Sequence, residues 1–255
     1  AKLKLKIFFL VLKKNKMPKG LFIFILLFLL PNCKKKCNAF EDPSDTIYGI
    51  DISHYQDDEK KINWELLKFN KTPKIDFIYI RSTMGIDGKD ISYEKNVSKL
   101  NENNFTFGVY HYFRPNESGK DQFDNFKKNT TFFGNLPVAI DVEEKGNMSI
   151  KKLKNEIKLF IEQFEKEFDN KLIIYSPQKF FNFYLWNSFK KHDIWIARQH
   201  GISEYPQSNL PNIKPYLFGS RCPLLWQFSG TGKIDGIEGN VDINISRKSI
   251  LDYHY

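Results

Sequence analysis

Cysteine is scarce in this chain, whose 255 residues include only Cys33, Cys37 and Cys222. An odd number, with two of the three near the start, excludes a disulfide framework and any cysteine-based zinc site. Cys222 is the single cysteine in the rest of the chain. We therefore expect a packed or free thiol there, with a Cys37–Cys222 bridge as the alternative.

Acidic residues are absent from the first 37 positions, which hold ten lysines. The chain has a formal net charge of +9, so removing those ten positive charges leaves −1 for residues 38–255. The basic character therefore belongs to the start of the chain. This distribution argues against a nucleic-acid-binding domain, and we expect no nucleic-acid partner.

Long apolar runs are also absent, apart from the ten residues Leu21–Leu30. That run is too short to span a membrane, and with the lysines before it, it is typical of a signal sequence. We expect residues 1–37 to be a signal or anchor segment, residues 38–46 a linker, and the mature protein a secreted or envelope-associated monomer. Leu30-Pro31-Asn32-Cys33 loosely resembles a bacterial lipoprotein cleavage site. A lipid on Cys33 is therefore the alternative to free secretion, and membrane contact is expected only through this segment.

From residue 47 onward, strand-like segments alternate with amphipathic helices. Runs of apolar and β-branched residues predict strands over Ile47–Ile52, Ile75–Arg81, Phe105–Phe113, Leu136–Val142, Leu172–Tyr175, Asp193–Ala197, Leu224–Phe228 and Asn240–Ile243. Helical spacing of apolar residues predicts helices over Asn63–Asn70, Ser92–Asn103, Gly119–Thr131, Ser149–Phe168 and Gln178–Leu185.

This alternation is typical of the α/β class with a parallel sheet. The sequence therefore predicts one domain over residues 47–255, an irregular β/α barrel similar to a TIM barrel, with about eight strands and fewer than eight helices. Gly201–Cys222 contains three prolines and is expected to be a long loop.

Carboxylates stand at the ends of three predicted strands. Asp51 ends the first, Asp141 and Glu143 end the Leu136–Val142 strand, and Asp242 ends the last. Strand residues two apart share a face, about 6–7 Å apart, and the active sites of such barrels lie at the carboxyl ends of the strands. A single aspartate at a strand end is usually a cap or turn residue. Acids at three strand ends indicate a shared cleft in which one acid keeps its proton, as glycoside cleavage requires.

An ordered set of motifs spans about residues 47–245. It comprises Gly49-Ile50-Asp51-Ile52-Ser53-His54-Tyr55-Gln56 with Ile62-Asn63-Trp64, Gly108-Val109-Tyr110-His111-Tyr112-Phe113, Asp141-x-Glu143, Ile174-Tyr175-Ser176, Trp195-Ile196-Ala197, Trp226-Gln227-Phe228-Ser229 and Gly239-Asn240-Val241-Asp242-Ile243-Asn244. Taken together and in this order, these motifs resemble those of glycoside hydrolase family 25 lysozymes.

The resemblance implies hydrolysis of the β-1,4 bond between N-acetylmuramic acid and N-acetylglucosamine in peptidoglycan glycan strands, without metal or cofactor. Carried over, Glu143 is the general acid and Asp141 orients the substrate's acetamido group as that group attacks the anomeric carbon. Asp51 and Asp242 line the same pocket. One departure stands out: Arg81-Ser82-Thr83-Met84-Gly85 replaces an expected Lys-Ala-Thr-Glu-Gly, which puts a substrate contact at Met84 in doubt.

Polar and aromatic residues on the same strands are candidates for substrate binding: Tyr79, Tyr110, Tyr112, Tyr175, Trp195 and Gln227. Aromatic faces pack on pyranose rings, but the same side chains can fill the barrel core, an alternative that weighs most for Tyr79 and Trp195. His54 and His111 lack a third spaced ligand and are expected to be hydrogen-bonding pocket residues rather than metal ligands.

Two other functions compete with the muramidase interpretation. One is a catalytically inactive barrel that binds cell-wall glycan, against which the complete set of acids argues. The other is a related acetamido-sugar hydrolase of the chitinase type, against which the opening and closing motifs argue.

Overall fold

Eight strands close into a barrel in the computed structural model, which describes residues 39–57, 62–70, 73–199, 214–219 and 221–253. The strand order is β1-β9-β8-β7-β6-β5-β4-β2, and pairing of β1 with β2 completes the ring. The predicted irregular β/α barrel is therefore confirmed. The expected signal segment, the possible lipid on Cys33 and most of the expected loop 201–222 lie outside the described residues.

Seven of the eight barrel strands run parallel, as their alternation with helices predicts. They are β1 (Thr46–Ile52), β2 (Phe77–Met84), β4 (Phe107–Tyr112), β5 (Ala139–Asp141), β6 (Ile173–Pro177), β7 (Ile194–Ala197) and β8 (Leu225–Ile234). The two-residue β3 (Gly88–Lys89) folds back onto the end of β2 and stands outside the ring.

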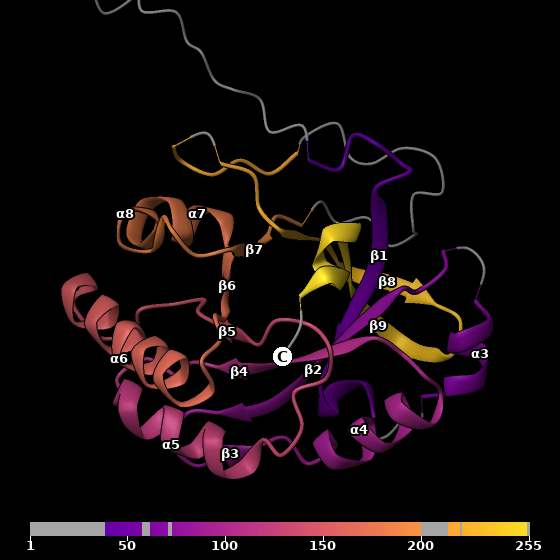
Figure 1. Cartoon of the computed structure of the whole chain (residues 1–255), viewed down its shortest axis with the longest axis horizontal. Helices are drawn as coiled ribbons and strands as arrows, with labels where there is room; N and C mark the ends of the chain where they lie inside the picture. Colours follow the sequence, from indigo (N-terminus) through magenta and orange to yellow (C-terminus); the bar gives the residue numbers. More distant parts are fainter. Residues whose placement is uncertain (1–38, 58–61, 71–72, 200–213, 220, 254–255) are drawn as a thin grey trace, which may run out of the picture. The chain divides into compact units, whose positions relative to one another are not determined.

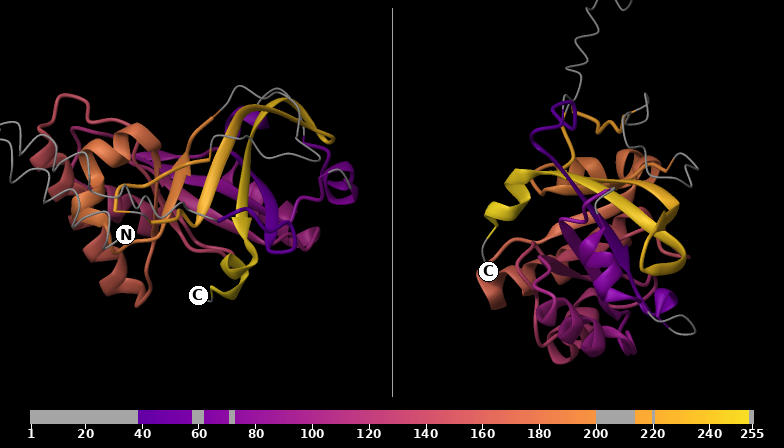
Figure 2. Two further views of the ribbon diagram at one scale, coloured as in Figure 1. Left: turned by 90° about the horizontal axis from the view of Figure 1, so that it is seen from above. Right: turned by 90° about the vertical axis from the view of Figure 1, so that its right-hand side faces the viewer.

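The last strand departs from the expected parallel sheet. β9 (Ile237–Arg247) runs antiparallel to both β8 and β1. Only two residues, Asp235 and Gly236, separate β8 from β9, which is too short a connection for a crossover helix, so the two strands form a hairpin. Figure 2 shows β8 and β9 (yellow) side by side at one edge of the barrel.

Most of the helices lie around the left, lower and right parts of the view in Figure 1, outside the strands. Their bounds are η1 (His54–Gln56), α3 (Trp64–Phe69), α4 (Tyr93–Glu102), α5 (Gly119–Asn129), α6 (Ile150–Phe168), α7 (Gln178–Phe180), the π-helix η2 (Phe181–Leu185), α8 (Trp186–Phe189) and η3 (Lys248–Asp252). In the residues that the structure describes, no helix combines the length and the apolarity that a membrane span requires.

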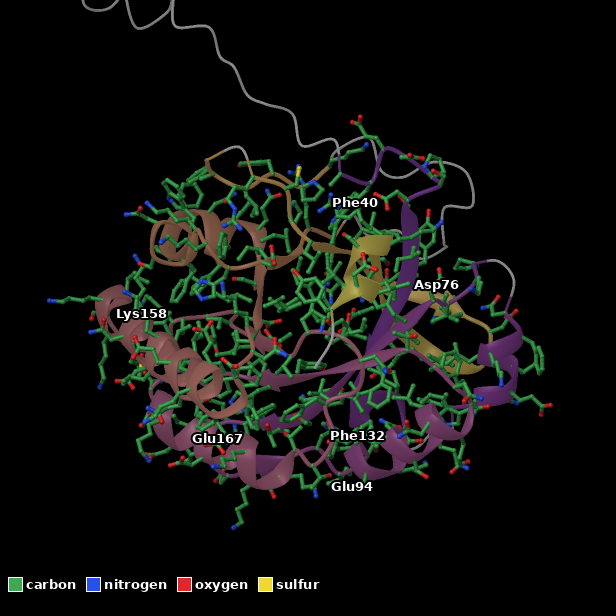
Figure 3. The ribbon with its side chains drawn as sticks, in the orientation of Figure 1. Phe40, Asp76, Glu94, Phe132, Lys158 and Glu167 are labelled. Atoms are coloured by element: carbon green, nitrogen blue, oxygen red, sulfur yellow. The ribbon has the colours of Figure 1, made fainter. Side chains whose placement is uncertain are left out.

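The long helix α6 follows directly from its sequence pattern. The side chain of Ser149 caps its first turn by accepting a hydrogen bond from Lys152 N, 3.2 Å away. Its buried stripe includes Phe160 and Phe164, and burying each such phenyl ring contributes about 1.5–3 kcal/mol. Lys158 points outward from the opposite face (Figure 3), and Glu167, near the end of the helix, forms an ion pair with Lys127 at 2.7 Å.

Two hydrophobic clusters divide the interior. One fills the space between strands and helices, and the other fills the barrel itself with inward-facing residues such as Phe77, Tyr79, Tyr175 and Trp195. The two clusters follow from strand alternation, because successive side chains point to opposite faces. The barrel interior is therefore packed with side chains, and only the layer at the carboxyl ends of the parallel strands can carry chemistry.

The segment expected as a linker packs on the barrel. Ala39 and Phe40 are buried, and the ring of Phe40 lies 6.1 Å from that of Trp226. Cys222 is disulfide-bonded, so the expectation of a packed or free thiol is wrong. The other two cysteines lie outside the described residues.

Candidate active site

A pocket opens at the end of the barrel toward which the parallel strands run. The volume of the pocket is about 670 Å³, including the part that is open to solvent. The lining residues are Asp51, Ile52, Ser53, Tyr55, Gln56, Arg81, Tyr110, Tyr112, Asp141, Glu143, Tyr175, Trp195, Gln227 and Asp242. Of the ten residues that the sequence predicts for the site, all but Tyr79 are among them.

Asp51 is held by two side-chain amides. Its Oδ2 accepts hydrogen bonds from Gln227 Nε2 at 3.0 Å and from Asn244 Nδ2 at 2.6 Å. The amide of Asn244 is itself fixed, because Trp195 Nε1 donates to Asn244 Oδ1 at 2.8 Å. Residues from β1, β7, β8 and β9 therefore fix one carboxylate at a single place in the pocket wall.

Asp242 faces Asp51 across the antiparallel pair β1–β9. The two residues are register partners, and their carboxyl groups share a hydrogen bond. Asp242 lies in the middle of β9 and not at a strand end, so its expected position is wrong although its place in the pocket is right. Because β9 runs against β1, its middle reaches the level at which β1 ends.

Asp141 is the last residue of β5, and Glu143 follows just beyond it. Asp141 is buried, and its Oδ1 accepts no hydrogen bond from the described part of the chain. Glu143 is exposed at the mouth of the pocket and is hydrogen-bonded to the Tyr175 hydroxyl. The two acids therefore differ in environment: Asp141 has a buried acceptor without a partner among the described residues, and Glu143 is accessible at the pocket mouth.

All four acids have raised pKa values. Burial is the main cause for each, and for Asp141, Glu143 and Asp242 the negative charges of neighbouring acids raise the pKa further. For Asp51, the amide donors Asn244 and Gln227 oppose the effect of burial on the pKa. Burial beside Asp51 raises the pKa of Asp242 to about 8. A site of this kind holds protonated and ionised acids side by side near neutral pH.

Aromatic side chains complete the floor and walls. Tyr175 and Trp195 meet edge to face with ring centroids 4.9 Å apart. The Tyr175 hydroxyl lies 2.9 Å from Gln227 Oε1, and its single proton can be donated either to this oxygen or to the Glu143 carboxylate. Tyr110 and Tyr112 line the pocket from β4. Burial together with the charge of Glu143 raises the pKa of Tyr112 to about 12, so this hydroxyl remains a donor across the working range of pH.

Tyr79 does not reach the pocket, and its expected role in binding is wrong. Its side chain is fully buried one layer below Arg81 on β2, and its hydroxyl donates to the carbonyl of Pro137 at 2.9 Å. Its ring packs 4.7 Å from that of Trp195. Tyr79 therefore supports the floor of the pocket from beneath.

Arg81 was not predicted as a site residue, although its replacement of an expected lysine is visible in the sequence. Its Nε donates to Asp90 Oδ2 at 2.8 Å, and its guanidinium lies 5.4 Å from the centroid of the Tyr55 ring. The buried carboxylate of Asp90 also accepts from the backbone N–H of His54 at 3.1 Å. Arg81 is thus a fixed cation in the pocket wall, and its charge opposes the rise in the pKa of Asp141.

The two histidines have different positions. His54 contacts Asp90 and Arg81 beside the pocket, whereas His111 lies buried between Thr83 and Gln122. Burial lowers the pKa of His111 to about 3, so it stays neutral in the core, and its expected place in the pocket is wrong. Among the described residues, no cluster of three or more potential metal ligands is found. Met84 pairs with Tyr112 at the end of β2 and is not among the residues that line the pocket.

Known proteins are similar to this chain in sequence and in fold. The chain is 31% identical over 205 residues to the uncharacterized protein YegX of Escherichia coli, covering 79% of this chain and 70% of that one. It is 28% identical over 218 residues to lysozyme M1 of Streptomyces globisporus, covering 79% and 69%. The structure of a family 25 glycosyl hydrolase from Bacillus anthracis matches with a TM-score of 0.70 and 25% identity, covering 85% of this chain and 97% of that one.

The sequence profile of the family described as glycosyl hydrolases family 25 matches residues 50–237. The matched segment holds Asp51, Asp141 and Glu143, and it ends five residues before Asp242. More than half of the chain therefore follows the family pattern, and this protein belongs to glycosyl hydrolases family 25.

Proposed function

We propose that this chain is a lysozyme that hydrolyses the β-1,4 bond between N-acetylmuramic acid and N-acetylglucosamine in peptidoglycan. The observation that carries the proposal is the paired arrangement of Asp141 and Glu143 in one pocket. Both have raised pKa values, and Asp141 keeps a buried acceptor without a partner. The similarity to lysozyme M1 of Streptomyces globisporus supports the same substrate.

Glu143 acts as the general acid. Its position at the mouth of the pocket gives it access to the glycosidic oxygen, and its raised pKa keeps it protonated closer to neutral pH. As the bond breaks, the leaving sugar takes the proton from Glu143. The resulting carboxylate then accepts a proton from the water that completes hydrolysis.

Asp141 acts on the substrate's 2-acetamido group. The free Oδ1 accepts the acetamido N–H, which increases electron density on the acetamido oxygen as it attacks the anomeric carbon. The bond between this carbon and the leaving oxygen breaks as the cyclic intermediate forms, and water later opens it. Two inversions at the same carbon retain the β configuration.

The remaining pocket residues hold the sugar and set the charge. Asp51 is the ionised member of its pair because two amides donate to it, and Asp242 holds the shared proton. Tyr110, Tyr112, Tyr175, Trp195 and Gln227 supply aromatic faces and hydrogen-bonding groups around the sugar ring. Neither a metal nor a cofactor has a step in this scheme.

Mass spectrometry of the fragments released from purified peptidoglycan tests the function in one experiment. A muramidase leaves fragments with reducing-end N-acetylmuramic acid. Reducing-end N-acetylglucosamine, or cleavage of chitin in preference to peptidoglycan, would instead identify a different acetamido-sugar hydrolase. Binding without release of fragments would identify an inactive glycan-binding barrel.

We infer in addition that the protein acts outside the cytoplasm as a monomer, and that residues 1–37 direct its export. The support is the lysine-flanked apolar run in that segment and a substrate that lies in the cell wall. Fractionation of the native host should place the protein in the envelope or the medium. A full-length cytoplasmic form would contradict the inference.

A further inference from the structure

An exposed group of aromatic side chains lies beside the pocket and has no part in the chemistry above. Phe183 and Trp186 come from η2 and α8, and Tyr216 and Phe218 come from the segment 214–219. The ring of Phe218 lies 5.7 Å from Phe183, 6.0 Å from Trp186 and 6.3 Å from Tyr216. We call these four residues the aromatic strip.

The strip is solvent-accessible. The side chain of Phe183 is 69% exposed and that of Tyr216 is 51% exposed. Large aromatic groups exposed side by side on a soluble domain usually mark a binding surface. Trp186 belongs to α8, and α7 and α8 lie beside β6 and β7 (Figure 1).

Buried hydrogen bonds fix the strip in place. The side chain of Asn182, which is buried, donates to the carbonyl of Tyr216 at 3.0 Å and accepts from the N–H of Phe218 at 2.9 Å. Gln178 Oε1 accepts from the N–H of Tyr216 at 2.9 Å. The exposed rings are therefore held before any ligand arrives, and little conformational entropy is lost on binding.

Two consecutive residues join the strip to the catalytic pocket. Gln199 Nε2 donates to Oε1 of the pocket residue Gln227 at 2.9 Å. The guanidinium of the preceding residue, Arg198, lies 5.7 Å from the centroid of the Tyr216 ring. Both residues follow β7 directly, at the end of the barrel where the pocket opens. Arg198 and Gln199 therefore connect Tyr216 to the pocket residue Gln227 through direct contacts.

We propose that the aromatic strip binds the glycan strand beyond the sugars that occupy the pocket. One face of a pyranose ring carries C–H groups, which pack on aromatic faces. Arg198 adds a positive charge beside Tyr216, which suits the carboxylates of the stem peptides that peptidoglycan carries. A bilayer is the less favoured occupant, because pressing this face onto a membrane would cover the adjacent pocket mouth.

This inference rests on the proposed glycan substrate, so binding and turnover are tested separately. In the full chain carrying Glu143→Gln to stop turnover, co-sedimentation with purified insoluble peptidoglycan measures affinity. Adding Phe183→Ala or Tyr216→Ala should weaken binding up to about tenfold for each ring removed. Phe69→Ala is the matched control, because Phe69 is 67% exposed on α3, across the barrel from α7 and α8, and its loss should leave binding unchanged.

A second measurement uses the active enzyme. The ratio of kcat/KM on long glycan strands to kcat/KM on a tetrasaccharide fragment should fall several-fold in the strip variants and stay constant in Phe69→Ala. Strip variants that bind and cleave long strands as the parent does would overturn the proposal. Strip variants that bind glycan as the parent does but co-sediment less with anionic phospholipid vesicles would also overturn the proposal. If the parent cleaves nothing but the strip variants still lose glycan binding, the strip stands and the catalytic proposal fails.

Discussion

The carboxyl groups of Asp51 and Asp242 meet across the seam between the first and last strands of the barrel and share one hydrogen bond. Two ionised carboxylates cannot share such a bond, so the pair keeps a proton while the pH stays below the pKa of Asp242, about 8. Asp51 receives the amide donors, and Asp242 supplies the proton. This pair makes the stability and the activity of the protein depend on pH.

Asp242→Asn should stabilise the protein increasingly as the pH rises from about 4 to about 8. Over that window the folded wild type retains a proton that the unfolded chain, with a pKa near 3.8, has released. The wild type therefore loses free energy of unfolding as the pH rises, and the variant lacks the part of this loss that is due to Asp242. Urea unfolding across this range measures the difference. The Asp235→Asn variant, at an exposed position, is the control. If the free energy of unfolding of Asp242→Asn differed from that of the wild type by the same amount at every pH, the assignment of the proton to Asp242 would be contradicted.

Glu143→Gln should lower kcat by about 10²–10⁴-fold while glycan binding persists, because the leaving oxygen loses its proton donor. The neighbouring exposed residue provides a matched control, and Glu144→Gln should behave as the wild type. An aryl glycoside, if accepted, departs with little protonation and should partly restore the rate of Glu143→Gln. If Glu143→Gln retained full activity on peptidoglycan, Glu143 would not be the general acid.

Asp141→Asn should be equally severe, but the aryl glycoside should not rescue it. The lost interaction is with the acetamido group that attacks the anomeric carbon, and a better leaving group does not replace it. NMR of the first products should show the β anomer. An early α anomer would exclude the acetamido route and would make Asp141 or Asp51 the base that activates water.

Substitutions of two tyrosines distinguish a role in core packing from a role in the active site. Tyr79→Phe leaves the carbonyl of Pro137 without its donor and should cost about 1–3 kcal/mol of stability, with kcat unchanged. Tyr175→Phe removes a hydrogen bond that lowers the pKa of Glu143, so the alkaline limb of the activity profile should move to higher pH. Thermal unfolding and pH–rate profiles of both variants test this. A shifted pH profile for Tyr79→Phe would contradict its place beneath the pocket.

The order of strands and helices was predictable because each element has its own local pattern. The apolar stripe of α6 and the alternation in β6 depend only on neighbours along the chain. The acids at the ends of β1 and β5 were also predictable, because parallel strands of one barrel end at the same level. Asp51, Asp141 and Glu143 therefore follow from the sequence.

Strand direction and depth were not predictable in the same way. The sequence around Asp242 does not show that its strand runs backward, so its position in the middle of β9 was missed. Tyr79 and Arg81 both point into the barrel and differ only in depth, by two residues along β2. Asn244 was missed because its partner Asp51 lies 193 residues away along the chain. Asp90 was missed because its role arises from Arg81 and His54, which lie 9 and 36 residues away and meet only in the folded chain.

The pairing of β1 with β9 also fixes when the catalytic centre can exist. Asp51 is synthesised early, but its register partner and one of its two amide donors belong to the last strand. A nascent chain that has not yet produced β9 therefore lacks both the closed barrel and the proton-sharing pair. Contacts this distant in sequence form late in folding. The full set of acids therefore cannot assemble until β9 has been synthesised and has paired with β1.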